Sequence, residues 1–233
     1  MIDLYGMFGP NVRKVGIMLE ELGADYTLHH AASFHGEQFT PEFLAQNPPG
    51  KIPVLIDHDK GGGVPVYESG AILIYLAETY NALLPPPGQA RYEVLEWLMV
   101  QMAAIGAMFG EHNHFQLLGA QSNAQAAARY RSQTETLYRQ LEERLAARGW
   151  FAGNAYSIAD IAIYPCASYL EQHGFAPAAY PRLMRWRETV GARPAVGRMM
   201  QRFAAACSEP ASHNAPPGRV FRRPPAGLST ARA

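Results

Sequence analysis

The sequence has little cysteine, no excess of one charge and no long uncharged apolar stretch. Its two cysteines, Cys166 and Cys207, stand far apart among 233 residues, which excludes a disulfide scaffold and a zinc site built from cysteine pairs. Lys plus Arg number 20 and Asp plus Glu number 20, so the basic excess of nucleic-acid-binding proteins is missing and we expect no nucleic-acid partner. No uncharged apolar run reaches the ~18 residues of a spanning helix, so we expect no membrane partner.

What is present is enough apolar material for a packed core. Hydrophobic residues make up 48% of the chain and charged residues 17%, which excludes wholesale disorder. The opening residues, Met1 to Tyr5, show neither the basic segment nor the long apolar segment of a signal peptide. With the low cysteine content, this predicts a cytoplasmic protein.

The first 82 residues alternate between strand-like and helix-like patterns. Pro10 begins and Gly23 ends a predicted helix, whose apolar stripe is Val12, Val15, Leu19 and Leu22. Thr40 is expected to cap a second helix and Ser69 a third. Apolar segments predict strands near residues 2–5, 26–28, 54–56 and 66–67. The order β-α-β-α-β-β-α predicts a small mixed sheet with helices on both faces.

The rest of the chain is predicted to be helical. Residues 83–89 form a Pro-rich linker, and residues 90–207 carry apolar side chains at helical spacing. Ser157 and Asp160 have the spacing of a capping box, and Pro181 and Pro194 each mark the first turn of a helix. Residues 208–233 are rich in Pro, Ala, Ser and Arg and predict a poorly ordered tail. The predicted fold class is therefore α+β with two domains, the second an all-α bundle.

Four short sequence motifs follow one another along the chain at the spacing found in a known protein family. They are residues 4–15 around Gly9-Pro10-Asn11, then Lys51-Ile52-Pro53-Val54-Leu55, Glu68-Ser69-Gly70-Ala71-Ile72 and Tyr156-Ser157-Ile158-Ala159-Asp160-Ile161-Ala162. Together they resemble the glutathione transferase family from Met1 to about Phe203. The opening Met1-Ile2-Asp3-Leu4-Tyr5, Gln38-Phe39 and Arg129-Tyr130 are similar to the nu class, which is associated with glutathione-dependent disulfide reduction.

The resemblance implies an architecture and a co-substrate. It implies a thioredoxin-like, glutathione-binding domain over residues 1–82, followed by the helical domain. It further implies glutathione as co-substrate, no metal, and a homodimer.

The resemblance also assigns glutathione-binding residues. It implies a cis bond between Ile52 and Pro53, which leaves the Ile52 backbone free to pair with the peptide backbone of glutathione. It assigns Ser69 and nearby amides to the γ-glutamyl carboxylate, and Glu68 to the ammonium of that end. The structural alternatives are a strand-entry proline and a serine that only caps its helix.

Three further binding residues rest on the resemblance. Lys51 could meet the glycyl carboxylate as a point charge, and Gln38 could hydrogen-bond the same peptide. Arg129 matches an arginine that relatives direct toward a second glutathione. The alternative for each is a solvated surface side chain.

Asn11 is the predicted catalytic residue. It lies where relatives hold the glutathione sulfur with Ser, Tyr or Cys, and Gly9 replaces the usual Ser or Thr. With no hydroxyl there, the Asn11 amide and the backbone N–H groups after Pro10 are expected to stabilise the thiolate. Tyr5 is an alternative hydroxyl, although its strand position favours the core, and Asn11 could instead cap the helix.

Two other features invite a chemical interpretation. His112 and His114 would diverge on a helix and have no third ligand at a supporting interval, so we expect no metal and place this segment in the cleft or at a dimer contact. Cys166, beside Pro165 in an apolar helix, is expected to be buried and inert.

The sequence therefore predicts an enzyme that applies the thiolate of bound glutathione to a small disulfide or electrophile. Conjugation or isomerisation at an electrophilic carbon is one alternative. A non-catalytic binding module of the same fold is the other. The loss of a hydroxyl at Gly9 keeps that module possible, while intact Ile52-Pro53 and Glu68-Ser69 argue against it.

Overall fold

The computed structural model of the chain describes residues 1–31, 37–119 and 123–206. Cys207 and the predicted tail lie outside the described residues. The first part contains, in the predicted order, β1 (Ile2–Gly6), α1 (Pro10–Leu22), β2 (Tyr26–His30), α2 (Pro41–Gln46), β3 (Val54–Asp57), β4 (Pro65–Tyr67) and α3 (Ser69–Tyr80). A short 3-10 turn, Glu37–Phe39, precedes α2.

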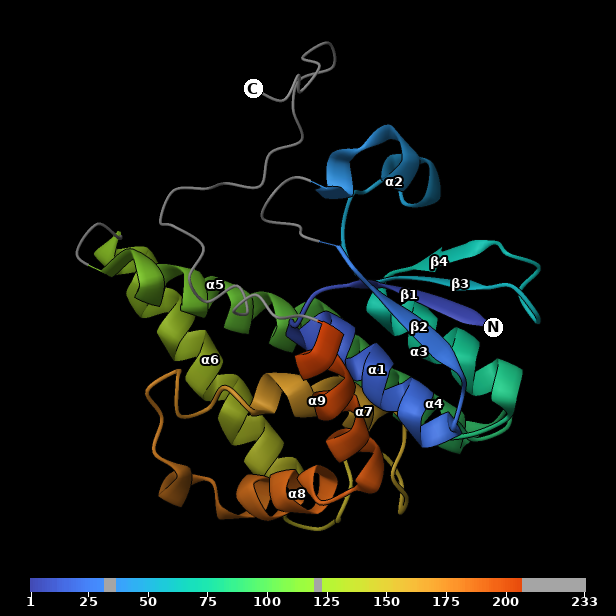
Figure 1. Cartoon of the computed structure of the whole chain (residues 1–233). Helices are drawn as coiled ribbons and strands as arrows, with labels where there is room; N and C mark the ends of the chain where they lie inside the picture. Colours follow the sequence, from blue (N-terminus) through green and yellow to red (C-terminus); the bar gives the residue numbers. More distant parts are fainter. Residues whose placement is uncertain (32–36, 120–122, 207–233) are drawn as a thin grey trace, which may run out of the picture.

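The four strands form one mixed sheet in the order β2-β1-β3-β4. β1 runs parallel to β2 and antiparallel to β3, which is antiparallel to β4. Leu4 and Leu55 point into the main core beneath the sheet, where α1 and α3 lie, whereas Val54 packs with Phe43 of α2 on the other face (Figure 1). The predicted two-faced sheet is confirmed.

The local helix signals are largely confirmed. Pro10 is the first residue of α1, and Gly23 follows its end in the left-handed conformation, with φ of 60°. The Thr40 hydroxyl accepts the Phe43 N–H at 3.3 Å and caps α2. Ser157 and Asp160 form the predicted capping box at the start of the helix Ile158–Ala167.

Ser69 is the exception among the predicted caps. The residue before α3 is Glu68, with φ of 67°, and no side chain caps the helix. Ser69 already has helical backbone, so its hydroxyl is free to point away and donates to Met102 Sδ at 3.8 Å. The prediction that Ser69 caps α3 is wrong.

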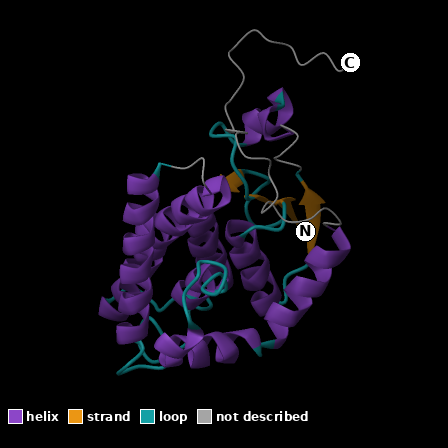
Figure 2. Ribbon diagram, turned by 90° about the vertical axis from the view of Figure 1, so that its left-hand side faces the viewer, coloured by secondary structure: helices purple, strands orange, loops and turns teal. Residues whose placement is uncertain are grey.

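The second part consists of helices: α4 (Gln89–Val100), α5 (Gly106–Leu118), α6 (Ala124–Arg144), α7 (Ile158–Ala167), α8 (Pro181–Gly191) and α9 (Pro194–Ala206), with a 3-10 turn at Pro177–Ala179. A π-helical turn, Gln101–Ile105, joins α4 to α5 in one long rod. The Pro-rich stretch lies between α3 and α4. Figure 2 shows the strands gathered at one end and helices filling the other. The helix Gln89–Leu118 is long and apolar enough to cross a membrane. Core helices of soluble proteins also meet this criterion of length and composition.

Helix α1 connects the two parts, because it packs on α3 and also on α7 and α9. Glu20 accepts from Arg198 Nε at 2.9 Å, and Glu21 accepts from Arg193 Nε at 2.5 Å. A Cβ on Gly16 would lie 2.7 Å from the ring of Phe203 in α9. The missing side chain is therefore what allows α1 and α9 to approach closely.

We expect Gly16→Ala to lower the free energy of unfolding by about 1–3 kcal/mol, because the added methyl group overpacks this contact. Gly197→Ala is the matched control, since a Cβ on this α9 residue meets nothing within 4 Å. The control should be neutral or stabilising by up to ~1 kcal/mol, the usual gain when Ala replaces Gly inside a helix. Urea unfolding measures both, and equal stability of the two variants would contradict the overpacking argument.

Candidate active site

A cavity of about 130 Å³ opens where α1, β3 and α3 begin. It is lined by Asn11, Asn47, Lys51, Ile52, Pro53, Glu68 and Ser69. All of these except Asn47 are residues that the sequence analysis proposed for catalysis or ligand binding. Segments far apart in the chain are therefore brought to one site.

The peptide bond between Ile52 and Pro53 is cis, as the resemblance implied. Pro53 directly precedes β3 and is buried, while Ile52 is half-buried at the cavity. No backbone hydrogen bond of Ile52 is found among the described residues. Its N–H and C=O can therefore pair with the backbone of an extended ligand.

Asn47 is the lining residue that the sequence analysis missed. It is buried at the end of α2, and its Nδ2 donates to the carbonyl of Lys51. The Gly50 N–H donates to the Asn47 carbonyl at 2.9 Å, which closes the turn before Lys51. An asparagine before prolines and a glycine reads only as a turn signal, so its positioning role was not visible in the sequence.

The start of α3 supplies polar groups suited to a charged ligand. Ser69 is buried and Glu68 is exposed. Glu68 has a positive φ, which is uncommon for a residue other than glycine and recurs at ligand sites. The first N–H groups of α3 have no intrahelical partner, so they can donate to an anion.

Asn11 lies exposed in the first turn of α1. The residue preceding the helix is Gly9, and no side chain caps α1, so the alternative that Asn11 is a capping residue is wrong. Tyr5 stacks on His29 with ring centroids 4.6 Å apart and packs on the α2 side of the sheet. Tyr5 does not line the cavity, which leaves the Asn11 amide as the side-chain donor at the start of α1.

Gln38 and Arg129 do not line this cavity. The side chain of Gln38 is buried, and its Oε1 has no hydrogen-bond partner among the described residues. Gln38 lies in the 3-10 turn, and its proposed hydrogen bond to glutathione stays a prediction. Arg129 is exposed on α6, and its proposed contact with a second glutathione stays a prediction.

The histidines of α5 lie apart from each other. His112 is buried, and its Nε2 lies 3.1 Å from the carbonyl of His173, so this residue faces the core, while the expectation that the segment lies in a cleft or at a dimer contact stays a prediction. His114 is exposed. Within the described part of the chain, no three His, Cys, Asp or Glu side chains gather in a way that could hold a metal.

Cys166 is buried, as predicted. Its side chain is 4% exposed, and its Sγ accepts from Gln101 Nε2 at 3.4 Å. Burial raises the pKa of the Cys166 thiol, because desolvation disfavours the thiolate. Such a thiol is a poor nucleophile.

The cavity combines two positive helix ends with side chains of both charges. α1 and α3 both begin at it, and each helix N-terminus favours an anion. Lys51 adds a cation and Glu68 an anion. The arrangement can therefore hold a zwitterionic peptide in extended form and lower the pKa of a thiol placed at the start of α1.

This fold and cavity define a thioredoxin-like domain with a helical partner domain, and family models match both parts. The model of the glutathione S-transferase N-terminal domain matches residues 1–78, and that of the C-terminal domain matches residues 97–194. The chain belongs to the glutathione S-transferase family.

Among its relatives is the disulfide-bond oxidoreductase YfcG of Escherichia coli, 39% identical over 86% of this chain and 94% of that protein. A glutathione transferase family member from Pseudomonas fluorescens, solved with two glutathione molecules bound, is 38% identical with a TM-score of 0.78, over 85% of this chain and 92% of the other. A Pseudomonas putida glutathione transferase, solved with one glutathione disulfide per subunit, is 36% identical with a TM-score of 0.78, over 86% of this chain and 90% of the other.

Proposed function

We propose that this glutathione transferase reduces small disulfides with the thiolate of bound glutathione. The observation that carries the proposal is a cavity built for a zwitterionic peptide that contains no cysteine among its lining residues. Cys166 is buried, so it does not supply the attacking sulfur. Since the described residues hold no other cysteine, we assign the attacking thiolate to the ligand.

We place each end of glutathione in this cavity as the family resemblance implies, and the lining residues support that placement. The α-carboxylate of the γ-glutamyl end lies at Ser69 and the first amides of α3, with its ammonium at Glu68. The backbone of the cysteinyl residue pairs with Ile52, and the glycyl carboxylate faces Lys51. This orientation places the sulfur at the start of α1, beside Asn11.

The reaction is two successive thiol–disulfide exchanges. The bound thiolate attacks one sulfur of the substrate disulfide, the new S–S bond forms, and the other sulfur leaves as a thiolate that takes up a proton. A second glutathione thiolate then attacks the mixed disulfide, which releases the second substrate thiol and glutathione disulfide. The P. putida relative holds glutathione disulfide, which is the oxidised product of such a reaction.

Comparing two substrates tests this function. We expect kcat/KM for a dialkyl disulfide to exceed that for an activated aryl halide, because the aryl reaction must stabilise charge on the ring with a site that lacks a hydroxyl at Gly9. A higher kcat/KM for the aryl halide would contradict the proposal and indicate glutathione conjugation at carbon as the function. Absence of both activities with retained glutathione binding would favour the non-catalytic module.

Ser69→Ala should weaken glutathione binding by about 1.5–3 kcal/mol, because it removes a hydrogen bond to a carboxylate. Stability should change little, since Ser69 caps no helix. Ser157→Ala is the matched control: this serine is a true cap, so it should lose about 1 kcal/mol of stability and no affinity. Calorimetric titration measures binding, and an unchanged Kd in Ser69→Ala would remove Ser69 from the site.

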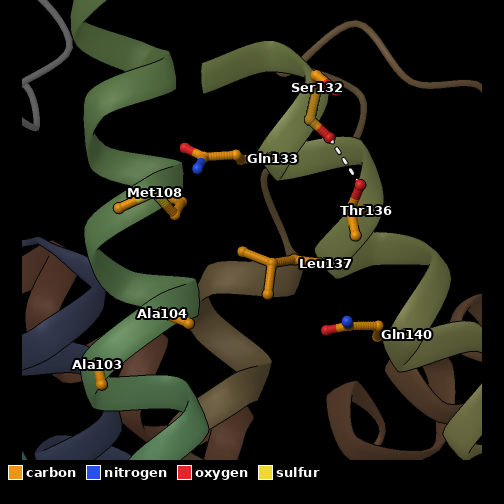
Figure 3. Close-up of a pocket in the computed structure, with 8 residues that line it drawn as sticks. All are labelled: Ala103, Ala104, Met108, Ser132, Gln133, Thr136, Leu137 and Gln140. Carbon is orange, nitrogen blue, oxygen red and sulfur yellow. Dashed lines mark hydrogen bonds between the residues drawn. The ribbon is translucent and has the colours of Figure 1, made fainter. Parts of the chain in front are cut away.

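We further propose that the protein is a homodimer that works in the cytoplasm, where reduced glutathione is available. A groove of about 370 Å³ lies between the long rod and α6, and its lining carries no charge (Figure 3). The lining residues are Ala103, Ala104, Met108, Ser132, Gln133, Thr136, Leu137 and Gln140. Tyr92 and Met99, which are 62% and 48% exposed, precede Ala103 on one face of the rod. Such an uncharged face with exposed apolar side chains along it suits a second copy of the chain.

Light scattering tests the dimer. We expect the wild-type protein to have about twice the chain mass of 25.6 kDa and Met99→Arg to be a monomer, because a buried unpaired charge disrupts the contact. Met200→Arg, at an exposed methionine of α9, is the control and should leave the mass unchanged. A monomeric wild-type protein would contradict the proposal.

A further inference from the structure

Lys14 is a buried lysine at the junction of the two domains. It lies one turn into α1, and its side chain is 0% exposed. Its Nζ donates to Gln101 Oε1 at 2.7 Å and lies 3.7 Å from Met102 Sδ. No carboxylate of the described residues forms an ion pair with it. A buried ammonium without a counter-ion is costly, so its presence calls for a reason.

A π-helical turn brings two neighbouring side chains to this lysine. On a regular α-helix, consecutive side chains point about 100° apart. In the π turn that begins at Gln101, both Gln101 and Met102 contact Lys14. Gln101 is held on its other side by the Sγ of Cys166. π turns of this kind occur frequently at functional sites.

Met102 connects Lys14 to the cavity. The same Sδ that lies 3.7 Å from Lys14 Nζ lies 3.8 Å from Ser69 Oγ. Gly70 allows this approach, because a Cβ there would lie 3.0 Å from Met102 Cγ. The ammonium therefore lies behind the N-terminus of α3, with one sulfur atom between it and Ser69.

We propose that Lys14 is a positioning residue for glutathione, whose buried charge attracts the α-carboxylate of the γ-glutamyl end onto Ser69. The inference rests on the proposed glutathione site. Little water separates the two charges, so their attraction is stronger than at the surface. Burial lowers the pKa of Lys14 to about 8, because desolvation disfavours the ammonium more than the Glu68 carboxylate favours it. An anion at Ser69 supplies the partner that this charge lacks.

The test changes the charge on the protein and on the ligand separately. The ligands are S-hexylglutathione, which has no free thiol, and its derivative with the α-carboxylate converted to a carboxamide. The variants are Lys14→Met, which keeps the length and removes the charge, and Gln101→Glu, which keeps Lys14 and neutralises it locally. Lys60→Met is the matched control. Lys60 is exposed and follows the C-terminal end of β3, whereas Pro53 and the cavity lie at its N-terminal end. Calorimetry at pH 7 measures Kd.

We expect Lys14→Met and Gln101→Glu each to weaken S-hexylglutathione binding by about 5- to 30-fold, and to change carboxamide binding less than about twofold. Lys60→Met should change neither Kd. Equal losses for both ligands would show that Lys14 has only a structural role and would overturn the proposal. Unchanged binding of S-hexylglutathione would also overturn it. Absence of S-hexylglutathione binding to the wild-type protein would instead contradict the proposed function.

Discussion

Asn11→Ala should lower kcat/KM for disulfide reduction by roughly 10- to 1,000-fold, the range expected when one preorganised donor to a developing or stabilised anion is lost. Asn11 lines the cavity at the positive end of α1, where Gly9 offers no hydroxyl and Tyr5 faces the other side of the sheet. Its amide is therefore the side-chain group that we expect to lower the pKa of the glutathione thiol. Steady-state kinetics with a dialkyl disulfide measure the loss.

The control for this variant is Asn123→Ala. Asn123 caps α6, and its side chain accepts the Ala126 N–H at 2.9 Å, so its loss should cost about 1 kcal/mol of stability and no activity. Asn11 caps nothing, so its loss should cost activity with little stability. Full activity in Asn11→Ala would mean that the backbone amides of α1 stabilise the glutathione thiolate and that Asn11 is not a catalytic residue.

Asp160→Ala should lower the free energy of unfolding by about 3–5 kcal/mol, because it leaves several buried donors without an acceptor. The carboxylate is 0% exposed. Its Oδ1 accepts the Trp186 Nε1–H at 2.9 Å and the Phe151 N–H at 3.2 Å. Its Oδ2 accepts the N–H and the hydroxyl of Ser157, at 3.1 and 3.2 Å.

Urea unfolding followed by tryptophan fluorescence measures this loss, and Trp186 reports directly on the site. Glu42→Ala is the matched control, because Glu42 is an exposed acid in the first turn of α2. An acid in that position contributes about 0.3–1 kcal/mol through the helix dipole. A loss in Asp160→Ala no larger than in the control would contradict the role given to the buried network.

Part of the candidate site was predicted because its residues belong to recognisable segments. Asn11, Lys51 to Pro53, and Glu68 with Ser69 were proposed from the resemblance, and the cavity brings them together. Asn47 was missed, since its contact with the Lys51 carbonyl has no sequence signature beyond a turn. Gln38 lies outside the lining of this cavity, so its role in binding stays a prediction.

The sequence by itself determined the features that depend on neighbours within about one helical turn. Helix starts and ends depend on backbone groups only three or four residues away, so their sequence patterns predict them. The examples here are Pro10, Gly23, Thr40 and the Ser157–Asp160 capping box. Only the tertiary structure decided where the Ser69 hydroxyl points, and it joined Lys14 to Gln101, which is 87 positions away. These contacts depend on how the π turn and α1 pack across the domain junction, and packing between distant segments leaves no periodic signal in the chain.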